Sequence, residues 1–392
     1  MNLNSVARRA LCALLAAGAV LAVDLWQRPS VPAPARAVWP AASAPPGVDQ
    51  WVPSGRGDIP MPAGALAAHA STLLAMPAGH AAALTLFWFS GERESGPQVQ
   101  IAASQWDRAT RQWAPARLVV NRHAMAAALG FGVRRLGNPV AWMDGSGRMH
   151  LFVVATGWGG WAASRILHLR QSSAGNGLQE LHFAPQRVLP LSWLWNTSHL
   201  VRNAPLPLAD GGMVLPVHFE LGFKYPVALR LDAQGNFLGM VRISRRNYAL
   251  QPTLLATTAT DWLALMRDER PEGKVIAAQT HDGGRTWHDV PDLALVNPDS
   301  AVGGGALAAG QLVLAHNTSP DSRAFLTLSG SSDGRVWKQI YALERGSGED
   351  EYSYPAMAWA DGSLWVSYTV DRQRIAWQRF TPAAQTSSGG TP

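Results

Sequence analysis

The stretch THDGGRTWHDV, Thr280–Val290, stands between two apolar runs and combines residues that favour a tight turn. Asp282 can accept hydrogen bonds from nearby backbone amides, and Gly284 can adopt a positive φ. Trp287 follows at the start of the next run, where its ring can cover the joint between two strands. The pattern therefore predicts a β-hairpin in which Asp282 forms the turn and takes no part in catalysis.

Two further segments resemble this turn. SSDGRVW, Ser331–Trp337, is one residue shorter, and SQWDRATRQW, Ser104–Trp113, keeps a weaker trace of the pattern. The recurrence of one turn along the chain indicates a protein built from repeated units.

A longer pattern occurs six times: a small or Pro-containing start, an apolar stretch, a Gly or Asp-Gly turn, and a strongly apolar strand. The copies begin at His69, Asn138, Arg202, Gln251, Asn297 and Tyr354. Their starts lie roughly 45 to 70 residues apart, which is enough for four short strands and their turns. Helical periodicity is nearly absent from this region, so the sequence predicts an all-β, six-bladed β-propeller.

The turn at Thr280, Asp282, Gly284, Thr286 and Trp287 resembles the Asp-box of the BNR repeat found in sialidases (neuraminidases) and related propellers. The resemblance covers about residues 65–380 and implies a sialidase-like six-bladed propeller. In sialidases three arginines hold the substrate carboxylate, a Tyr paired with a Glu is the nucleophile, and an Asp is the acid/base. A neutral Tyr nucleophile avoids repulsion from an anionic sugar.

Several residues match functional positions of sialidases, although their types differ. His69 stands where the family places its first arginine, and Arg93 resembles the arginine of the next Gly-Arg segment. Glu94 is the carboxylate nearest to the acid/base position. Tyr354 lies near the position of the family's tyrosine, with Tyr352 as an alternative.

The third repeat aligns with the strand that carries the glutamate in sialidases. Arg202 and His218 occupy the positions of that glutamate and of the arginine that follows it. His218 and Glu220 alternate onto one side of a strand, where they could form a general acid/base pair or only a structural hydrogen bond. Arg267 could reach a ligand or end its strand in an ordinary ion pair.

The first strand of each propeller blade lines the central channel, so polar residues at the repeat starts are predicted to face a ligand. These residues are His69, Arg202, Asn203, Gln251, Asn297 and Tyr354. The alternative is a hydrogen-bonded channel lining without a ligand. The predicted catalytic residues are Tyr354, Glu94, Glu220 and His218, and the predicted substrate-binding residues are His69, Arg93, Arg202, Asn203, Arg267 and Asn297.

Trp158 and Trp161 stand in the Gly-rich segment TGWGGWAASR, where they could stack on a sugar or pack across a blade joint. The sequence contains no common metal-binding or nucleotide-binding motif, so neither a metal nor another cofactor is expected.

The net charge of +6 comes almost wholly from arginine, because Lys224, Lys274 and Lys338 are the only lysines. The arginines are scattered singly along the chain, and a nucleic-acid-binding protein would cluster them in a stripe. Arg side chains can bind carboxylate or phosphate groups through two parallel hydrogen bonds. The composition thus argues against a nucleic-acid partner and is consistent with an anionic ligand.

The N-terminus has the features of an export signal. Arg8 and Arg9 precede an apolar run from Ala10 to Val23, which is short for a membrane span and matches a signal peptide with a cleavage site after Val20–Ala22. An uncleaved membrane anchor with Trp26 at the interface is the alternative. The only cysteine, Cys12, lies in this run, so the folded part is expected to have no disulfide.

Composition divides the chain into four parts. Residues 1–28 form the signal peptide or anchor, and residues 29–62 are a Pro/Ala-rich linker that reads as a semi-rigid spacer. Residues 63–380 form the propeller, and residues 381–392 are a tail of disordered composition. Export would place the protein in the periplasm or outside the cell, with possible anchoring to the membrane.

These features favour an exported sialidase-like glycoside hydrolase that acts on a glycan with an acidic sugar. A non-catalytic propeller that binds a glycan or a protein is the first alternative. A lyase acting on uronate-containing polymers is the second, because His and Tyr can supply its base and acid.

Overall fold

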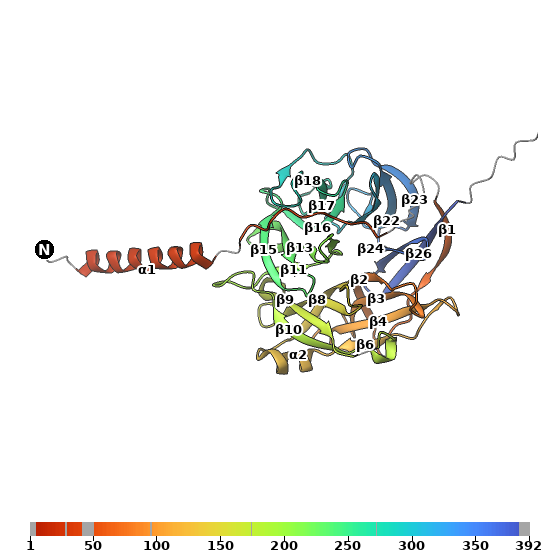
Figure 1. Ribbon diagram of the computed structural model, residues 1–392, viewed down its shortest axis with the longest axis horizontal. Helices are drawn as coiled ribbons and strands as arrows, with labels where there is room; N and C mark the ends of the chain where they lie inside the picture. Colours follow the sequence, from red (N-terminus) through yellow and green to blue (C-terminus); the bar gives the residue numbers. More distant parts are fainter. Residues whose placement is uncertain are drawn as a thin grey trace, which may run out of the picture.

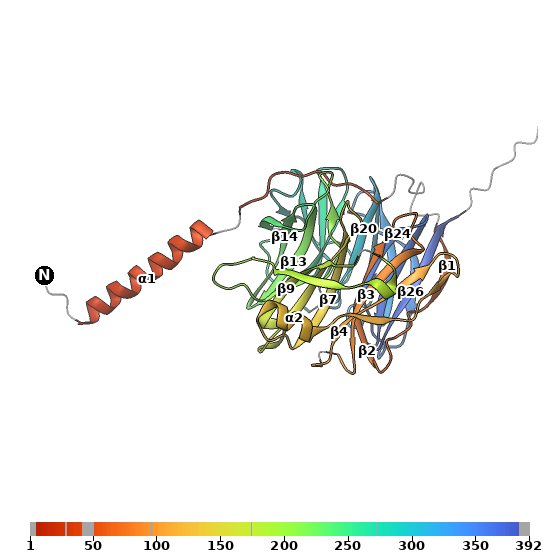
Figure 2. The same cartoon turned by 60° about the horizontal axis from the view of Figure 1, so that its bottom comes forward.

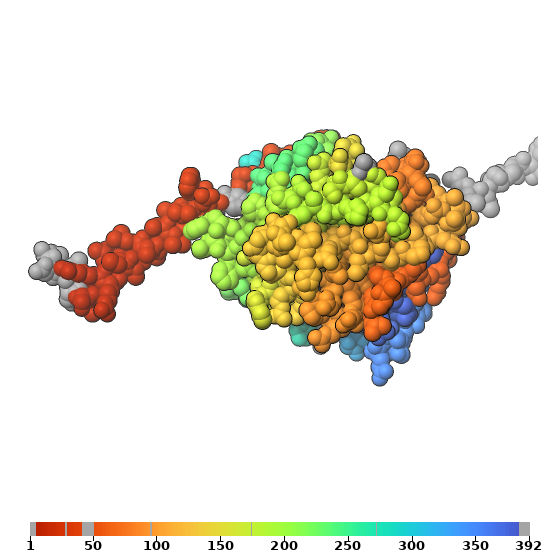
Figure 3. Space-filling model, turned by 90° about the horizontal axis from the view of Figure 1, so that it is seen from below, coloured from red at the N-terminus to blue at the C-terminus, as the bar shows by residue number. Residues whose placement is uncertain are grey.

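The computed structural model describes residues 5–27, 30–40, 51–94, 96–173, 175–271 and 273–383. Six antiparallel sheets surround a central axis and form a six-bladed propeller, as the sequence predicts (Figure 1). Helix α1 (Ser5–Gln27) projects from the side of the folded body, and its described side chains are not buried (Figure 3). This helix is long and apolar enough to cross a membrane.

Each of the first three blades runs from an inner strand at the axis to an outer strand at the rim. Blade 1 comprises β2 (Ala67–Ala75), β3 (Ala82–Gly91), β4 (Gln100–Asp107) and β5 (Gln112–Trp113), with β6 (Arg117–Val120) also pairing with β4. Blade 2 comprises β7 (Arg135–Met143), β8 (Met149–Thr156), β9 (Ser164–Gln171) and β10 (Phe183–Val188). Blade 3 comprises β11 (His199–Val201), β12 (Leu206–Pro207), β13 (Met213–Leu221), β14 (Phe223–Leu231) and β15 (Phe237–Arg242).

The last three blades follow the same order. Blade 4 comprises β16 (Ala249–Ala256), β17 (Trp262–Asp268), β18 (Ile276–Thr280) and β19 (His288–Asp289). Blade 5 comprises β20 (Gly303–Ala308), β21 (Gln311–Asn317), β22 (Phe325–Ser331) and β23 (Lys338–Arg345). Blade 6 comprises β24 (Tyr352–Ala360), β25 (Ser363–Val370), β26 (Arg374–Pro382) and β1 (Trp51–Asp58). The short helices are α2 (Arg122–Leu129), η1 (Gly160–Ala163) and η2 (Leu178–Glu180).

The outer strand of blade 6 comes from the other end of the propeller sequence. β1 pairs with β26 from Trp51↔Pro382 to Asp58↔Ala376, so the N-terminal part of the chain closes the ring of blades. The ring of Trp377 packs against Gly55 and Gly57, where an added Cβ would lie 3.2 and 3.3 Å from the indole. The linker predicted for residues 29–62 is therefore too long, because its last part is a strand of the propeller.

The first part of this predicted linker is also bound to the propeller. Ala37 forms an isolated bridge with Leu208, the Val38 amide donates to the Pro207 carbonyl at 3.1 Å, and the Ala35 amide donates to the carbonyl of Gly283 at 3.1 Å. Residues 30–40 cross blades 3 and 4 as an extended segment that we call the strap (Figure 1). Residues 41–50 and 384–392 lie outside the described residues, and the predicted tail begins inside β26.

The Asp-box turn has the geometry that its sequence predicts. Asp282 accepts hydrogen bonds from the Thr286 amide at 2.9 Å and from the Thr286 hydroxyl at 2.6 Å, while Trp287 Nε1 donates to the Gly284 carbonyl at 3.2 Å. In blade 5, Asp333 accepts from the Val336 amide at 2.9 Å in the same way. The prediction that Asp282 forms a turn is confirmed.

Tryptophans gather where the chain closes on itself. Trp106, Trp113, Trp365 and Trp377 form one aromatic group between blades 1 and 6, with ring centroids 5.0–6.3 Å apart. Large rigid rings bury much apolar area at little cost in side-chain entropy. These tryptophans therefore stabilise the joint that completes the propeller.

The inner strands of blades 1, 2, 4 and 6 share a bulge at the same height. Each bulge contains a residue other than glycine with positive φ: Ala70 (55°), Asn138 (38°), Gln251 (51°) and Tyr354 (54°). A bulge changes the direction of a side chain, and such a backbone conformation is costly outside glycine. The bulges lie at the end of the axis where the predicted site residues are found.

Candidate functional site

Tyr354 stands at the centre of the polar end of the propeller axis. Its ring lies 4.2 Å from the His69 ring, centroid to centroid, and 4.9 Å from the guanidinium carbon of Arg202. Its hydroxyl accepts a hydrogen bond from Gln251 Nε2 at 3.1 Å. The inner strands of blades 1, 4 and 6 and the chain that follows β11 of blade 3 thus bring four predicted channel residues together.

A second set of contacts surrounds this group. Arg267 donates from Nε to Asp299 Oδ1 at 2.6 Å and from an amino group to Gln251 Oε1 at 3.3 Å. Glu351 accepts from Arg323 at 3.0 Å and from Arg372 at 2.9 Å.

Three remaining contacts close these groups into a ring. Arg372 also donates to Glu94 at 2.8 Å, and Glu94 lies 3.9 Å from His69 Nε2. The Arg323 side chain donates to the Asp299 backbone carbonyl. We call this network, together with Arg202, the central cluster: His69, Glu94, Arg202, Gln251, Arg267, Asp299, Arg323, Glu351, Tyr354 and Arg372.

Burial lowers the pKa of two members. His69 is 4% exposed, and its desolvation lowers its pKa to about 3, so the ring is neutral at pH 7. Arg202 is 2% exposed, and burial lowers its pKa to about 10, so it stays charged at pH 7. No carboxylate among the described residues forms an ion pair with Arg202, whose amino groups donate to the carbonyls of Pro355 at 2.9 Å and Ser71 at 3.4 Å.

His218 and Glu220 form the pair that their alternation predicts. The distance from His218 Nε2 to Glu220 Oε2 is 3.2 Å, and His218 is fully buried. Burial favours the neutral form of Glu220, but the hydrogen bond from His218 and the positive charges of Lys224 and Arg267 outweigh it and lower the pKa of Glu220. The carboxylate is therefore ionised at neutral pH.

Comparison with known proteins identifies the family. A model of the BNR repeat-like domain matches residues 82–386. The chain belongs to the BNR repeat-like domain family. A search of curated protein sequences returned no match.

Solved structures share the fold of this BNR repeat protein at low sequence identity. A Hadza microbial sialidase is 16% identical with a TM-score of 0.66, covering 81% of this chain and 66% of that chain. Trypanosoma rangeli sialidase in complex with sialic acid is 12% identical with a TM-score of 0.63, covering 88% and 60%. A protein of unknown function from Dyadobacter fermentans is 13% identical with a TM-score of 0.63, covering 86% and 100%. The chain thus spans about two thirds or less of the length of these two sialidases.

In this BNR repeat protein, some predicted site residues form hydrogen bonds with the backbone and do not join the central cluster. Asn203 donates from Nδ2 to the carbonyls of Gln251 and Pro252, both at 3.0 Å, and so braces the bulge of blade 4. Asn297 donates to the Ser300 carbonyl at 2.8 Å and accepts from the Ser300 amide at 3.1 Å. Arg93 is exposed, and no ion pair within the described part of the chain joins it to the central cluster.

The two tryptophans of the β8–β9 loop differ in environment. Trp161 packs on the backbone at Gly137, where an added Cβ would lie 2.7 Å from the ring. Trp158 is 83% exposed and carries the Arg134 guanidinium 4.1 Å above its ring. Trp158 is therefore the member of the pair whose ring is open to solvent, with Arg134 over one face.

Four members of the central cluster were not among the site residues predicted from the sequence: Asp299, Arg323, Glu351 and Arg372. Arg323 and Arg372 lie in the connections from β21 to β22 and from β25 to β26, and Asp299 precedes β20. Inner strands begin at the polar end of the axis, and the hairpins between second and third strands return to the same end. A search of these hairpins for arginine would have found both side chains.

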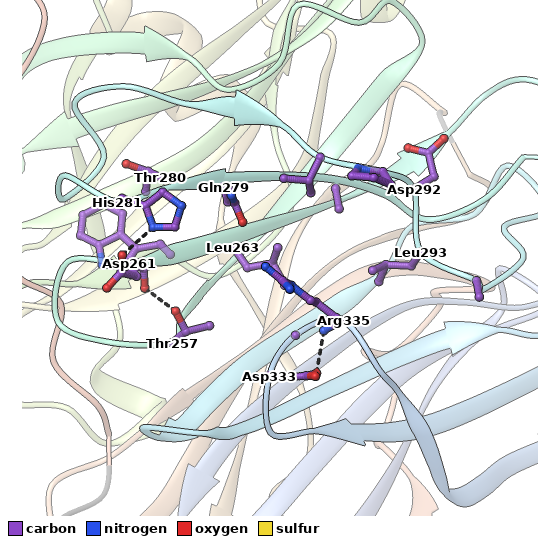
Figure 4. Close-up of a pocket in the computed structure, with 16 residues that line it drawn as sticks. Thr257, Asp261, Leu263, Gln279, Thr280, His281, Asp292, Leu293, Asp333 and Arg335 are labelled. Atoms are coloured by element: carbon purple, nitrogen blue, oxygen red, sulfur yellow. Dashed lines mark hydrogen bonds and ion pairs between the residues drawn. The ribbon is translucent and has the colours of Figure 1, made fainter.

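Several hollows among the described residues lie away from the central cluster. An apolar one of about 230 Å³ is lined by the far ends of the inner strands of all six blades and by Val38, Trp39 and Pro40 of the strap. A larger cleft of about 600 Å³ lies between blades 4 and 5, where His281 contacts Asp261 and Arg335 reaches across from the next Asp-box turn (Figure 4). Its lining contains none of the predicted site residues.

Proposed function

We propose that the protein is an exported sialidase-like propeller that binds a glycan through an acidic sugar at the central cluster. The observation that carries this proposal is Arg202, a guanidinium buried at the centre without a carboxylate partner among the described residues. Burying a charge is costly unless it is paired, so an anionic ligand would complete its coordination. The Arg202 guanidinium lies 4.9 Å from the centroid of the partly exposed Tyr354 ring, so the two side chains can meet the same ligand.

The environment of Tyr354 favours binding over turnover through a tyrosine nucleophile. A nucleophilic hydroxyl needs an adjacent base, and the partner of this hydroxyl is the amide of Gln251. Glu351 is a poor general acid: burial opposes its ionisation, but the bond from Arg372 and the charge of Arg323 outweigh it and lower its pKa.

Hydrolysis is the second candidate, and the ionised Glu220 beside His218 favours it. An ionised carboxylate beside an imidazole can accept a proton from water. The same pair could remove a proton in a lyase reaction on a uronate polymer, so products must be examined for both reactions.

The test is binding of the purified full chain to matched glycans with acidic and neutral terminal sugars. Arg202→Met is expected to weaken binding of the acidic glycans by at least about tenfold, because it removes the buried charge. Asn203→Ala is the matched control, since Asn203 also braces a bulge but carries no charge. Equal affinity of both variants for acidic glycans would contradict the proposal.

The same samples separate binding from catalysis. Reducing sugar released from the panel would support the hydrolase, and a product absorbing in the ultraviolet would support the lyase. Binding of acidic glycans without either product would support the binding protein.

A further inference from the structure

Blade 3 exposes large apolar side chains in two neighbouring loops. Trp193, Leu194 and Trp195, between β10 and β11, are 40%, 60% and 55% exposed, and Leu221 and Phe223, at the β13–β14 turn, are 41% and 76% exposed. The Glu220 amide donates to the Ser198 carbonyl at 2.9 Å, which joins the two loops. We call these five residues the blade 3 patch. Exposed apolar groups of this size mark an interaction surface.

The patch is tied to the C-terminal end of α1. Trp193 Nε1 donates to Asp24 Oδ1 at 3.2 Å, and Asp24 and Gln27 line the same hollow as Trp193 and Trp195. In Figures 1 and 2 the helix leaves the propeller from the side where blade 3 lies. The last turn of α1 and the patch are therefore neighbours.

The connection between α1 and the propeller is too short to let the two parts separate. The Ser30 hydroxyl donates to the Leu238 carbonyl at 3.2 Å, and the Met240 amide donates to the Ser30 carbonyl at 3.3 Å. Only residues 28 and 29 separate Gln27, where α1 ends, from this first contact of the strap with β15. A flexible spacer would leave the propeller free to move, but the strap holds blade 3 beside the helix.

We propose that α1 is retained as a membrane anchor and that the blade 3 patch lies in the interfacial layer of the same membrane. The occupant of this surface is the lipid bilayer, because the surface continues from the end of a helix long and apolar enough to span it. Trp side chains favour this layer, where the ring is among lipid groups and the N–H remains hydrogen-bonded. The propeller then stands on its edge with blade 3 towards the membrane, and its central axis runs along the surface (Figures 1 and 2).

The test uses the full chain reconstituted into vesicles of phosphatidylethanolamine and phosphatidylglycerol. In a Cys12→Ser background, which removes the only cysteine, Leu194→Cys is labelled with an environment-sensitive fluorophore. Lipids with a nitroxide near the headgroup are expected to quench this label about twofold, because an interfacial side chain lies within the headgroup layer. The control is Val336→Cys, whose native side chain is 62% exposed on an Asp-box turn of blade 5. Quenching at position 194 no greater than at position 336 would overturn the proposal.

A second pair of measurements keeps the two parts of the proposal separate. Trp193→Ser with Trp195→Ser is expected to reduce the quenching at position 194, whereas Trp158→Ser, which removes an exposed ring on blade 2, should leave it unchanged. The mass of the chain isolated from cell membranes tests the anchor. A chain that begins after Ala22 would overturn the proposal, and a chain that retains residues 5–27 would support it.

Discussion

At the scale of single residues, the centre of the molecule depends on side chains that hold strained backbone in place. Gln251 and Tyr354 have positive φ, which costs about 1–3 kcal/mol per residue outside glycine. Asn203 bonds to the Gln251 carbonyl and Arg202 to the Pro355 carbonyl, so blade 3 supports the bulges of blades 4 and 6. The bulged backbone at these two residues places the side-chain amide of Gln251 within hydrogen-bond distance of the Tyr354 hydroxyl.

This contact leads to a prediction about turnover. Gln251→Glu gives the Tyr354 hydroxyl a carboxylate partner in place of an amide, and Arg267 remains beside it to keep the new group ionised. If the missing base limits catalysis, release of an acidic sugar from an aryl glycoside should rise by at least about tenfold over the native protein. Gln251→Met is the control, because it has a similar size and no carboxylate. Equal rates for both variants would argue against a latent tyrosine nucleophile.

At the scale of elements, the Asp-box turns fix the outer halves of blades far from the central cluster. The carboxylate of Asp282 joins Thr280 and Thr286 across the β18–β19 turn. The turn also contacts the strap, because the Ala35 amide donates a hydrogen bond to the Gly283 carbonyl. The motif that identifies the family is thus a structural device, and in this protein it also holds the N-terminal segment.

The Asp-box should therefore affect stability and leave ligand binding unchanged. Asp282→Ala removes hydrogen bonds to the Thr286 amide and hydroxyl, and the free energy of unfolding should fall by about 1–2 kcal/mol. Urea denaturation measures this change, and the affinity for glycans should stay within error of the native value. Asp321→Ala, in an exposed loop, is the control and should change stability by less than about 0.5 kcal/mol. A loss of glycan binding in Asp282→Ala would place the turn in the site.

At the scale of the whole molecule, histidines are buried in several blades in the neutral state. Desolvation lowers the pKa of His69 and His168 to about 3 and of His199 and His316 to about 4. In the unfolded chain each ring takes up its proton near pH 6.5. Between pH 6.5 and 4 the unfolded state therefore binds more protons than the folded state, and stability falls as the pH falls.

The prediction is a marked loss of stability in mild acid. Each of these histidines can contribute up to about 1.4 kcal/mol per pH unit below 6.5, so unfolding at pH 5 should need much less urea than at pH 7.5. His316→Gln should reduce the difference in urea midpoint between the two pH values, because the unfolded chain then has one fewer histidine that binds a proton. The exposed His123 provides the control, since His123→Gln should leave the difference unchanged. The same midpoint at both pH values would contradict the neutral burial of these rings.

The sequence determined the class of fold because local chemistry defines it. Turn residues such as Asp282 and Gly284 form the same hairpin in any blade, and the alternation of turns with apolar strands repeats six times. Tyr354 and Gln251 could be placed at the axis because inner strands follow the turns at regular spacing. The apolar N-terminal run is likewise a local property of composition, and it predicts either a cleaved signal peptide or a membrane anchor.

Tertiary structure decided which residues meet. Arg323 and Arg372 join the central cluster because hairpins of different blades return to one end of the axis, and pairing across blades has no local signal. Asn203 and Asn297 were predicted to face a ligand, but hydrogen bonds to backbone carbonyls hold them. The Pro/Ala-rich segment has few large apolar residues, so its composition predicts a spacer. In the structure it forms the strap and an outer strand, because the blades supply hydrogen-bond partners for its backbone.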